Sequence, residues 1–189
     1  MSLVLAGAAL AASGQVGEAA PPYEARLMNS AERVTLSEQR GKAVLLNKWA
    51  TWCRPCIKEM PELEKLYRAH RSEGFVVIGV SIDRGDADGP TAAVAKERGV
   101  TYAIWRDSED EFTQTFRSTG VPESILVDRE GTVVYRWRGA LEATPGAERL
   151  IESALASTGD YGAVARAATA ESTNSIGFAL AVLAGLLSF

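Results

Sequence analysis

The two cysteines of this chain stand close together as Cys53-Arg-Pro-Cys56, and the runs on either side of them constrain the fold more than any other stretch. The preceding run, residues 43–49, is short and continuously apolar, which predicts a buried central strand. The following run, residues 55–71, has apolar residues at three- and four-residue steps, which predicts an amphipathic helix. A cysteine pair at a strand-to-helix turn indicates a redox pair more than a structural crosslink.

The predicted helix start favours thiolate chemistry at Cys53. Unpaired backbone N–H groups and the positive end of the helix dipole face a side chain placed there, and both stabilise negative charge on its sulfur. Cys56 lies one turn deeper, where it can attack a mixed disulfide formed on Cys53. We therefore predict that Cys53 is the nucleophile and Cys56 the resolving thiol. Arg54 tunes their redox balance by its charge, and Pro55 does so by stiffening the turn.

Composition argues against several other classes of protein. The formal net charge of −4 gives no basic patch, so no nucleic-acid partner is expected. Two cysteines are too few for a disulfide scaffold or a four-cysteine zinc site. The single histidine, His70, lies over about 20 Å along the helix from Cys56. We predict no metal, and no cofactor beyond the redox-active disulfide Cys53–Cys56 itself.

The other elements predict an α/β fold with a central mixed sheet flanked by helices. Residues 75–82 form a second buried strand, parallel to the first through a right-handed crossover that contains the helix, which Pro61 should kink. An N-terminal β-hairpin is predicted from residues 26–28 and 33–36, and a second hairpin from residues 125–127 and 132–137. Further helices are expected over residues 90–98, 109–116 with Ser108 as its cap, and 145–156 with Thr144 as its cap.

Composition changes at both ends predict a three-part chain. Residues 1–22 hold a short apolar run and a Pro-containing linker, which suits a signal peptide or an N-terminal anchor, although the usual positive residues before the run are missing. Residues 23–158 form the folded domain. Residues 159–189 are a small-residue linker and an apolar tail whose last 14 residues span about 21 Å, short of a bilayer core. Membrane anchoring through either end is left open.

Two separated motifs carry a family resemblance. The stretch from Asn47 to Pro61, which contains Trp52-Cys53-Arg-Pro-Cys56, resembles the active-site segment of the TlpA-like, membrane-anchored thiol–disulfide oxidoreductases (the ResA and cytochrome c maturation type) of the thioredoxin superfamily. The stretch Gly120-Val-Pro-Glu-Ser124 resembles the loop with a cis-proline that precedes a strand in that family. The resemblance implies a thioredoxin fold over about residues 27–155.

The resemblance also implies roles for individual residues. Pro122 would be cis and face the cysteine pair, and the Val121 backbone would pair with a client peptide as an added strand. Glu59 matches an acidic residue near the cysteines and would relay protons to Cys56. Glu123 matches an acidic position of the cytochrome c maturation branch, and Trp52 suits a platform at the substrate-binding site.

Three residues depart from the pattern or have a plainer interpretation. Asn47 stands where thioredoxin has an aspartate, so the buried-base role would fall to Glu59 or to water. Lys48 occupies a position that is usually apolar, and we expect its side chain to extend to an edge of the sheet. Trp49, like Trp52, suits a platform around the site, and its plainer interpretation is a core residue.

The function that this sequence favours is reduction of disulfides in extracytoplasmic, periplasmic client proteins, with electrons supplied by a membrane electron-donor protein, as the resemblance implies. A disulfide oxidant or isomerase is the alternative within the class. A thiol peroxidase would usually have its resolving cysteine far away in sequence. A copper-handling module would need ligands beyond this pair.

Overall fold

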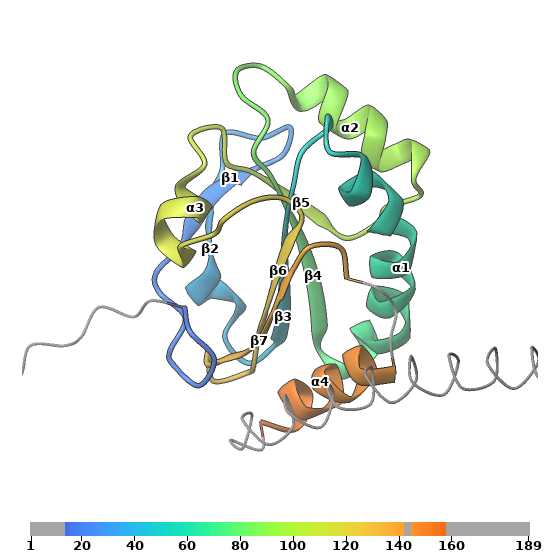
Figure 1. Cartoon of the computed structure of the whole chain (residues 1–189). Helices are drawn as coiled ribbons and strands as arrows, with labels where there is room; N and C mark the ends of the chain where they lie inside the picture. The colour runs from blue at the N-terminus through green and yellow to red at the C-terminus, as the bar shows by residue number, and fades with distance from the viewer. Residues whose placement is uncertain (1–13, 142–144, 158–189) are drawn as a thin grey trace, which may run out of the picture.

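The computed structural model describes residues 14–141 and 145–157, and its core is a mixed sheet of seven strands in the order β2-β1-β5-β4-β3-β6-β7 (Figure 1). The strands are β1 (Glu24–Leu27), β2 (Arg33–Thr35), β3 (Ala43–Trp49), β4 (Phe75–Ser81), β5 (Ala103–Arg106), β6 (Glu123–Val127) and β7 (Val133–Arg138). The helices are α1 (Arg54–His70), α2 (Asp88–Glu97), α3 (Glu111–Phe116) and α4 (Pro145–Ala156), with short 3₁₀ turns η1 (Leu36–Gln39) and η2 (Arg71–Glu73).

Strand β3 is an interior strand of this sheet, as its apolar sequence predicts. It pairs parallel with β4 and antiparallel with β6, and all seven of its residues are buried. Its side chains alternate between two hydrophobic cores: Leu45 and Trp49 pack on the side of α1 and α4, and Val44 and Leu46 pack on the side of α3. Burial of each of these leucines contributes about 1.5–3 kcal/mol, which anchors the strand that leads into the cysteine pair.

The parallel crossover and both predicted hairpins are confirmed. β1 and β2 are antiparallel neighbours at one edge of the sheet, and β6 and β7 are antiparallel neighbours at the other. The turn between β6 and β7 closes with a bond from the Gly131 N–H to the Asp128 C=O at 3.1 Å. These pairings complete the thioredoxin-type arrangement, in which the carboxyl ends of β3, β4 and β5 lie at the same edge as the start of β6.

Several element boundaries differ from the predicted ones. Helix α3 begins at Glu111 with Asp110 as its cap, rather than with Ser108, because the Asp110 carboxylate accepts the Thr113 N–H at 3.3 Å. Helix α2 begins at Asp88, so that Pro90 still falls in the first turn, where its missing N–H costs nothing. Pro61 lies inside α1, which continues to His70.

The predicted N-terminal linker is partly attached to the sheet. Ala19 forms an isolated antiparallel bridge with Thr132, and Gly17 N–H donates to the Val133 C=O at 2.8 Å. The apolar runs at the two chain ends, the linker from residue 159 and the cap at residue 144 lie outside the described residues. Within the described ranges, no helix is long and apolar enough to cross a membrane.

Candidate active site

Cys53 and Cys56 are joined by a disulfide where β3 gives way to α1, at the upper end of the molecule in Figure 1. Cys53 is the N-cap of α1, and its sulfur accepts a hydrogen bond from the Cys56 N–H at 3.3 Å. The helix start therefore directs a backbone donor and its positive dipole end at this sulfur, which stabilises a thiolate there after reduction. Cys53 is 4% exposed and Cys56 fully buried, so Cys53 is the sulfur nearer to solvent.

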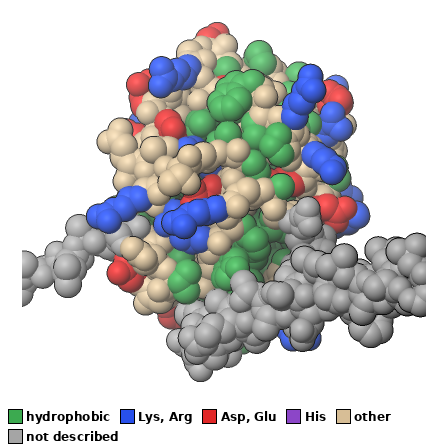
Figure 2. Space-filling model, in the orientation of Figure 1, with side chains coloured by type: hydrophobic (Ala, Val, Ile, Leu, Met, Phe, Trp, Pro, Cys, Tyr) green, Lys and Arg blue, Asp and Glu red, His purple; other side chains and the backbone are tan. Residues whose placement is uncertain are grey.

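The surroundings of Cys53 are open and amphipathic. Trp52 is 67% exposed, an unusual state for so large an apolar side chain, and Arg54 and Pro55 are exposed as well. Figure 2 shows green apolar side chains at this end of the molecule, with blue Lys and Arg side chains on both sides of them. A partner protein can therefore reach the disulfide over an apolar surface that has a charged margin.

The loop before β6 lies at the same edge of the sheet. The Val121–Pro122 peptide bond is cis, as the resemblance implies, and β6 pairs with β3 so that Glu123 lies opposite Lys48. Pro122 is buried, and its C=O accepts the Gly139 N–H at 2.9 Å. Val121 is partly exposed, and its backbone N–H and C=O have no hydrogen-bond partner within the described part of the chain. Those free groups suit pairing with an extended peptide.

Glu59 is held in a buried polar cluster on the inner side of α1. Its two carboxylate oxygens accept the Asn47 amide at 2.9 Å and the Leu141 backbone N–H at 2.6 Å, and the carboxyl is 5% exposed. Burial raises the pKa of Glu59 to about 7, against the opposing effect of the Asn47 and Leu141 donors. Because Glu59 follows Cys56 by three positions on one buried helix face, its carboxyl lies one turn along α1 from Cys56.

Asn47 thus binds the buried acid instead of replacing it. Its amide nitrogen also donates to the Ser124 hydroxyl at 3.0 Å, while its Oδ1 is buried without a partner among the described residues. Rotation of this amide would present Oδ1 to Glu59, as an acceptor for the proton of a neutral carboxyl.

The expected position of Lys48 at an edge of the sheet is wrong. Its side chain is 3% exposed and forms an ion pair with Asp110 at 3.1 Å. Its ammonium group also bonds the Thr113 hydroxyl and lies 3.4 Å from the Ser118 hydroxyl. Lys48 is buried because one carboxylate and two hydroxyls replace the hydration that its charge would lose.

Glu123 and Trp49 are both placed inside the protein. Glu123 is 1% exposed, forms an ion pair with Arg136 at 2.5 Å, and accepts the Thr119 N–H at 3.3 Å. Its carboxylate therefore braces the loop that carries the cis-proline. Trp49 is fully buried in the core beside α1.

Asp83 is a site residue that the sequence reasoning missed. It is 5% exposed, and its carboxylate accepts the Thr51 N–H at 3.0 Å, the Thr51 hydroxyl at 2.7 Å and the Ser81 hydroxyl at 2.9 Å. Asp83 therefore fixes the turn that ends at Cys53. The available signal was its position directly after the second buried strand, whose carboxyl end lies beside that of β3.

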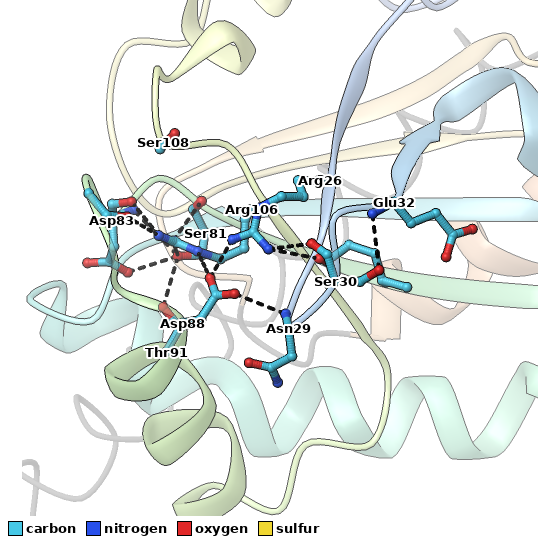
Figure 3. A network of polar contacts seen from close by, with 12 residues as sticks. Arg26, Asn29, Ser30, Glu32, Ser81, Asp83, Asp88, Thr91, Arg106 and Ser108 are labelled. Carbon is cyan, nitrogen blue, oxygen red and sulfur yellow. Dashed lines mark hydrogen bonds and ion pairs between the residues drawn. The ribbon is translucent and has the colours of Figure 1, made fainter.

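Asp83 belongs to a wider polar network that includes Arg106, Asp88 and Arg26 (Figure 3). The Arg106 guanidinium, 3% exposed, donates to the Ser81 hydroxyl at 2.6 Å and to the Asp83 C=O at 2.8 Å. Arg106 also forms an ion pair with Asp88 at 2.9 Å, and Asp88 in turn binds Arg26 of β1 at 2.6 Å. The N-terminal hairpin is thereby tied to the loop after β4, whose Asp83 holds the turn of residues 50–53, called the catalytic turn below.

Replacement of Asp83 by alanine tests this anchoring. We expect Asp83→Ala to lower the free energy of unfolding by about 2–3 kcal/mol, because three charge-assisted bonds are lost and the Thr51 N–H loses its acceptor. Urea unfolding of the oxidised protein measures this change. Asp86→Ala, an exposed carboxylate of the same loop, is the matched control and should change stability by less than about 0.5 kcal/mol. Equal losses in the two variants would show that Asp83 does not anchor the turn.

A groove of about 710 Å³ adjoins the catalytic turn and the cis-proline loop. Residues that line it include Trp52, Val121, Lys48, Asp110 and Asp83. Within the described residues, no group of three or more His, Cys, Asp or Glu side chains is arranged to hold a metal ion.

A Cys-x-x-Cys disulfide at the start of a helix, on a sheet whose next strand follows a cis-proline, defines the class: a thiol–disulfide oxidoreductase with a thioredoxin fold. The model of the Redoxin family matches residues 15–155. A thiol–disulfide oxidoreductase ResA from Bacillus cereus is 32% identical over 125 residues, which cover 65% of this chain and 69% of that protein. A ResA from Bacillus thuringiensis is 29% identical over 66% of this chain and 70% of its own length.

A solved structure agrees with these relatives. The thioredoxin domain of a thiol–disulfide oxidoreductase from Bacteroides vulgatus superposes with a TM-score of 0.58 at 30% identity, covering 65% of this chain and 87% of that one. The chain belongs to the redoxin family and, within it, to the ResA-type thiol–disulfide oxidoreductases.

Proposed function

We propose that this protein reduces disulfide bonds of client proteins outside the cytoplasm. The observation that carries the proposal is the placement of the two cysteines. The Cys53 sulfur caps α1 next to the exposed Trp52, whereas Cys56 is fully buried. The ResA-type relatives support the dithiol chemistry. The extracytoplasmic location is supported by the apolar N-terminal run and by the resemblance to membrane-anchored members of the family.

The reaction consumes the two electrons of the reduced cysteine pair. The Cys53 thiolate attacks one sulfur of the client disulfide, a mixed disulfide forms, and the other client sulfur leaves as a thiolate. Cys56 then loses its proton and attacks the Cys53 sulfur, which releases the second client thiolate and leaves the Cys53–Cys56 disulfide. Glu59 takes up the Cys56 proton, since its pKa of about 7 lets it accept and return a proton near neutral pH.

The residues around the pair divide the remaining work. The free peptide groups of Val121 hold the client backbone next to the buried Pro122, and Trp52 provides an apolar contact. Glu123 does not contact the client but stabilises the same loop by accepting the Thr119 N–H. Arg54 and Pro55 set the redox balance between dithiol and disulfide. A membrane electron-donor protein restores the dithiol, and a terminus of the chain anchors the domain near it.

The reduction potential of the Cys53/Cys56 pair tests the direction of this reaction. We expect a value near that of thioredoxin, about −270 mV, because a reductase must give its electrons to stable client disulfides. Equilibration with dithiol buffers of known potential, followed by alkylation of free thiols and mass measurement, gives the number. A potential near −120 mV would instead identify an oxidant of client thiols.

A further inference from the structure

Lys48 places a buried cation on β3, five residues before the nucleophile Cys53. Burial of a charge forfeits its hydration, which polar partners must replace. An apolar side chain would avoid this cost, because Val44 and Leu46 on the same face of the strand pack in a hydrophobic core. The contribution of the cation is therefore found in the groups that its ammonium contacts.

The polar partners that the structure shows for Lys48 all belong to one segment, residues 110–121. Its ammonium forms an ion pair with Asp110 at 3.1 Å, at the start of the segment. It also donates to the Thr113 hydroxyl, inside α3, and lies 3.4 Å from the Ser118 hydroxyl, beyond the end of that helix. The segment is thus connected to β3 at three points along its length.

This segment also lines the groove beside the disulfide and leads into the loop with the cis-proline. Its groove-lining members are Asp110, Thr113, Ser118, Thr119, Gly120 and Val121. The Ser118 hydroxyl donates to the Gly120 C=O at 3.2 Å. Lys48 is thereby connected, through Ser118, to the residue that precedes Val121.

The backbone of the segment depends on contacts of this kind. Helix α3 has six residues, and the residues on either side of it, Asp110 and Arg117, have left-handed φ values of 55° and 51°. Residues other than glycine adopt this conformation rarely, and a helix this short is not stable in isolation. Phe112 and Phe116 attach the helix to the core, and Lys48 holds its cap. Tertiary contacts, and not local preference, therefore set where the segment runs.

We propose that Lys48 is a positioning residue for the client: its ammonium holds residues 110–121 so that the Val121 peptide groups are placed to pair with the client strand at Cys53. The proposal rests on the proposed reductase function, in which Val121 pairs with the client backbone. Loss of the ammonium leaves the Ser118 hydroxyl, and with it the loop, free to occupy more positions. A preorganised loop binds at a smaller entropy cost, so its loosening weakens binding of a peptide client. A disulfide without peptide groups does not use the loop and is attacked as before.

Two disulfides, one with a peptide backbone and one without, test this role. The full-length protein is reduced, freed of reductant and mixed with a disulfide-linked dimer of an extended peptide or with hydroxyethyl disulfide. The ratio of the two second-order rate constants for formation of the mixed disulfide cancels any change in the reactivity of Cys53 itself. We expect Lys48→Met, which removes the ammonium and keeps the bulk of the side chain, to lower the ratio of peptide to small-disulfide rates by about tenfold. Glu123 still holds Thr119 in this variant, so the loop loosens without being lost.

Ser118→Ala is the second variant, because it removes the hydroxyl between Lys48 and the Gly120 C=O without changing any charge. It should lower the same ratio by about threefold. Lys65→Met is the matched control, since it removes an exposed lysine that forms an ion pair with Glu62, and it should keep the wild-type ratio.

An unchanged ratio in Lys48→Met or in Ser118→Ala overturns the inference, and so does the same fall in Lys65→Met. A proportional loss of rate with both disulfides counts as an unchanged ratio, because it shows a general loss of structure or of thiol reactivity. Should Lys48→Met fail to fold, Ser118→Ala alone decides. Absence of reaction of wild type with the peptide dimer, while hydroxyethyl disulfide is reduced, would instead refute the reduction of client proteins on which the inference rests.

Discussion

Cys53→Ser is expected to abolish disulfide reduction, and Cys56→Ser is expected to accumulate a covalent complex with the client, because each variant removes one of the two thiols. The Cys53 sulfur lies at the start of α1 and is the one nearer to solvent. Cys56 is fully buried, so a client disulfide cannot reach its sulfur before the mixed disulfide with Cys53 has formed. Without Cys53 the first bond cannot form, whereas without Cys56 it forms and is not resolved.

Non-reducing electrophoresis and mass spectrometry distinguish these outcomes. A peptide dimer with one disulfide is added to each reduced variant, and the mass of the adduct is measured. Wild type should release two peptide thiols per protein. Cys56→Ser should retain one peptide and release the other, while Cys53→Ser should retain none. A stable adduct on Cys53→Ser, or full turnover by either variant, would contradict the assignment of nucleophile and resolving thiol.

The sequence predicted the parts of the fold whose signals are local. The apolar run that became β3, the turn between β6 and β7, and the cysteine pair at a helix start each depend on residues close together in the chain. The family resemblance added the cis bond before Pro122, which a sequence cannot reveal by itself because few such bonds are cis.

The polar partners inside the site could not be predicted in the same way. Lys48 meets Asp110 across 62 positions of sequence, and Glu59 meets the Leu141 N–H across 82. Each contact depends on how the sheet brings distant loops to one edge. An isolated lysine in an apolar run therefore indicated only that a partner or a route to solvent was needed, and the structure supplies the partner.

Glu59→Gln should remove a pH dependence of stability that the buried carboxyl creates. The native pKa of Glu59 is about 7, against 4.5 for the free side chain, so the native state holds a proton that the unfolded state releases. For a raised pKa, the stabilisation is fully present below about pH 4.5 and is lost as the pH rises through about 7. Wild type should therefore lose about 2.5 kcal/mol of unfolding free energy relative to Glu59→Gln between pH 5 and pH 8.5.

Urea unfolding of the oxidised proteins at those two pH values measures the difference. Comparison of wild type with the variant cancels groups such as Asp88, whose pKa is lowered to about 2 mainly by the hydrogen bond from Arg26. Glu62→Gln, a more exposed carboxylate on the same helix that pairs with Lys65, is the matched control and should follow wild type. Parallel pH dependences for wild type and Glu59→Gln would mean that Glu59 does not titrate in this range.

The same variant separates the two chemical steps. Attack by Cys53 does not need Glu59, so Glu59→Gln should form the mixed disulfide at the wild-type rate. Resolution by Cys56 needs a proton acceptor, and loss of a general base slows such a step by about 10²–10⁴-fold. Glu59→Gln should thus accumulate the mixed disulfide transiently and resolve it faster as the pH rises, because hydroxide then replaces the carboxylate. Equal resolution rates in wild type and variant would contradict proton transfer to Glu59. The residue would then act only through its structural contacts to Asn47 and Leu141.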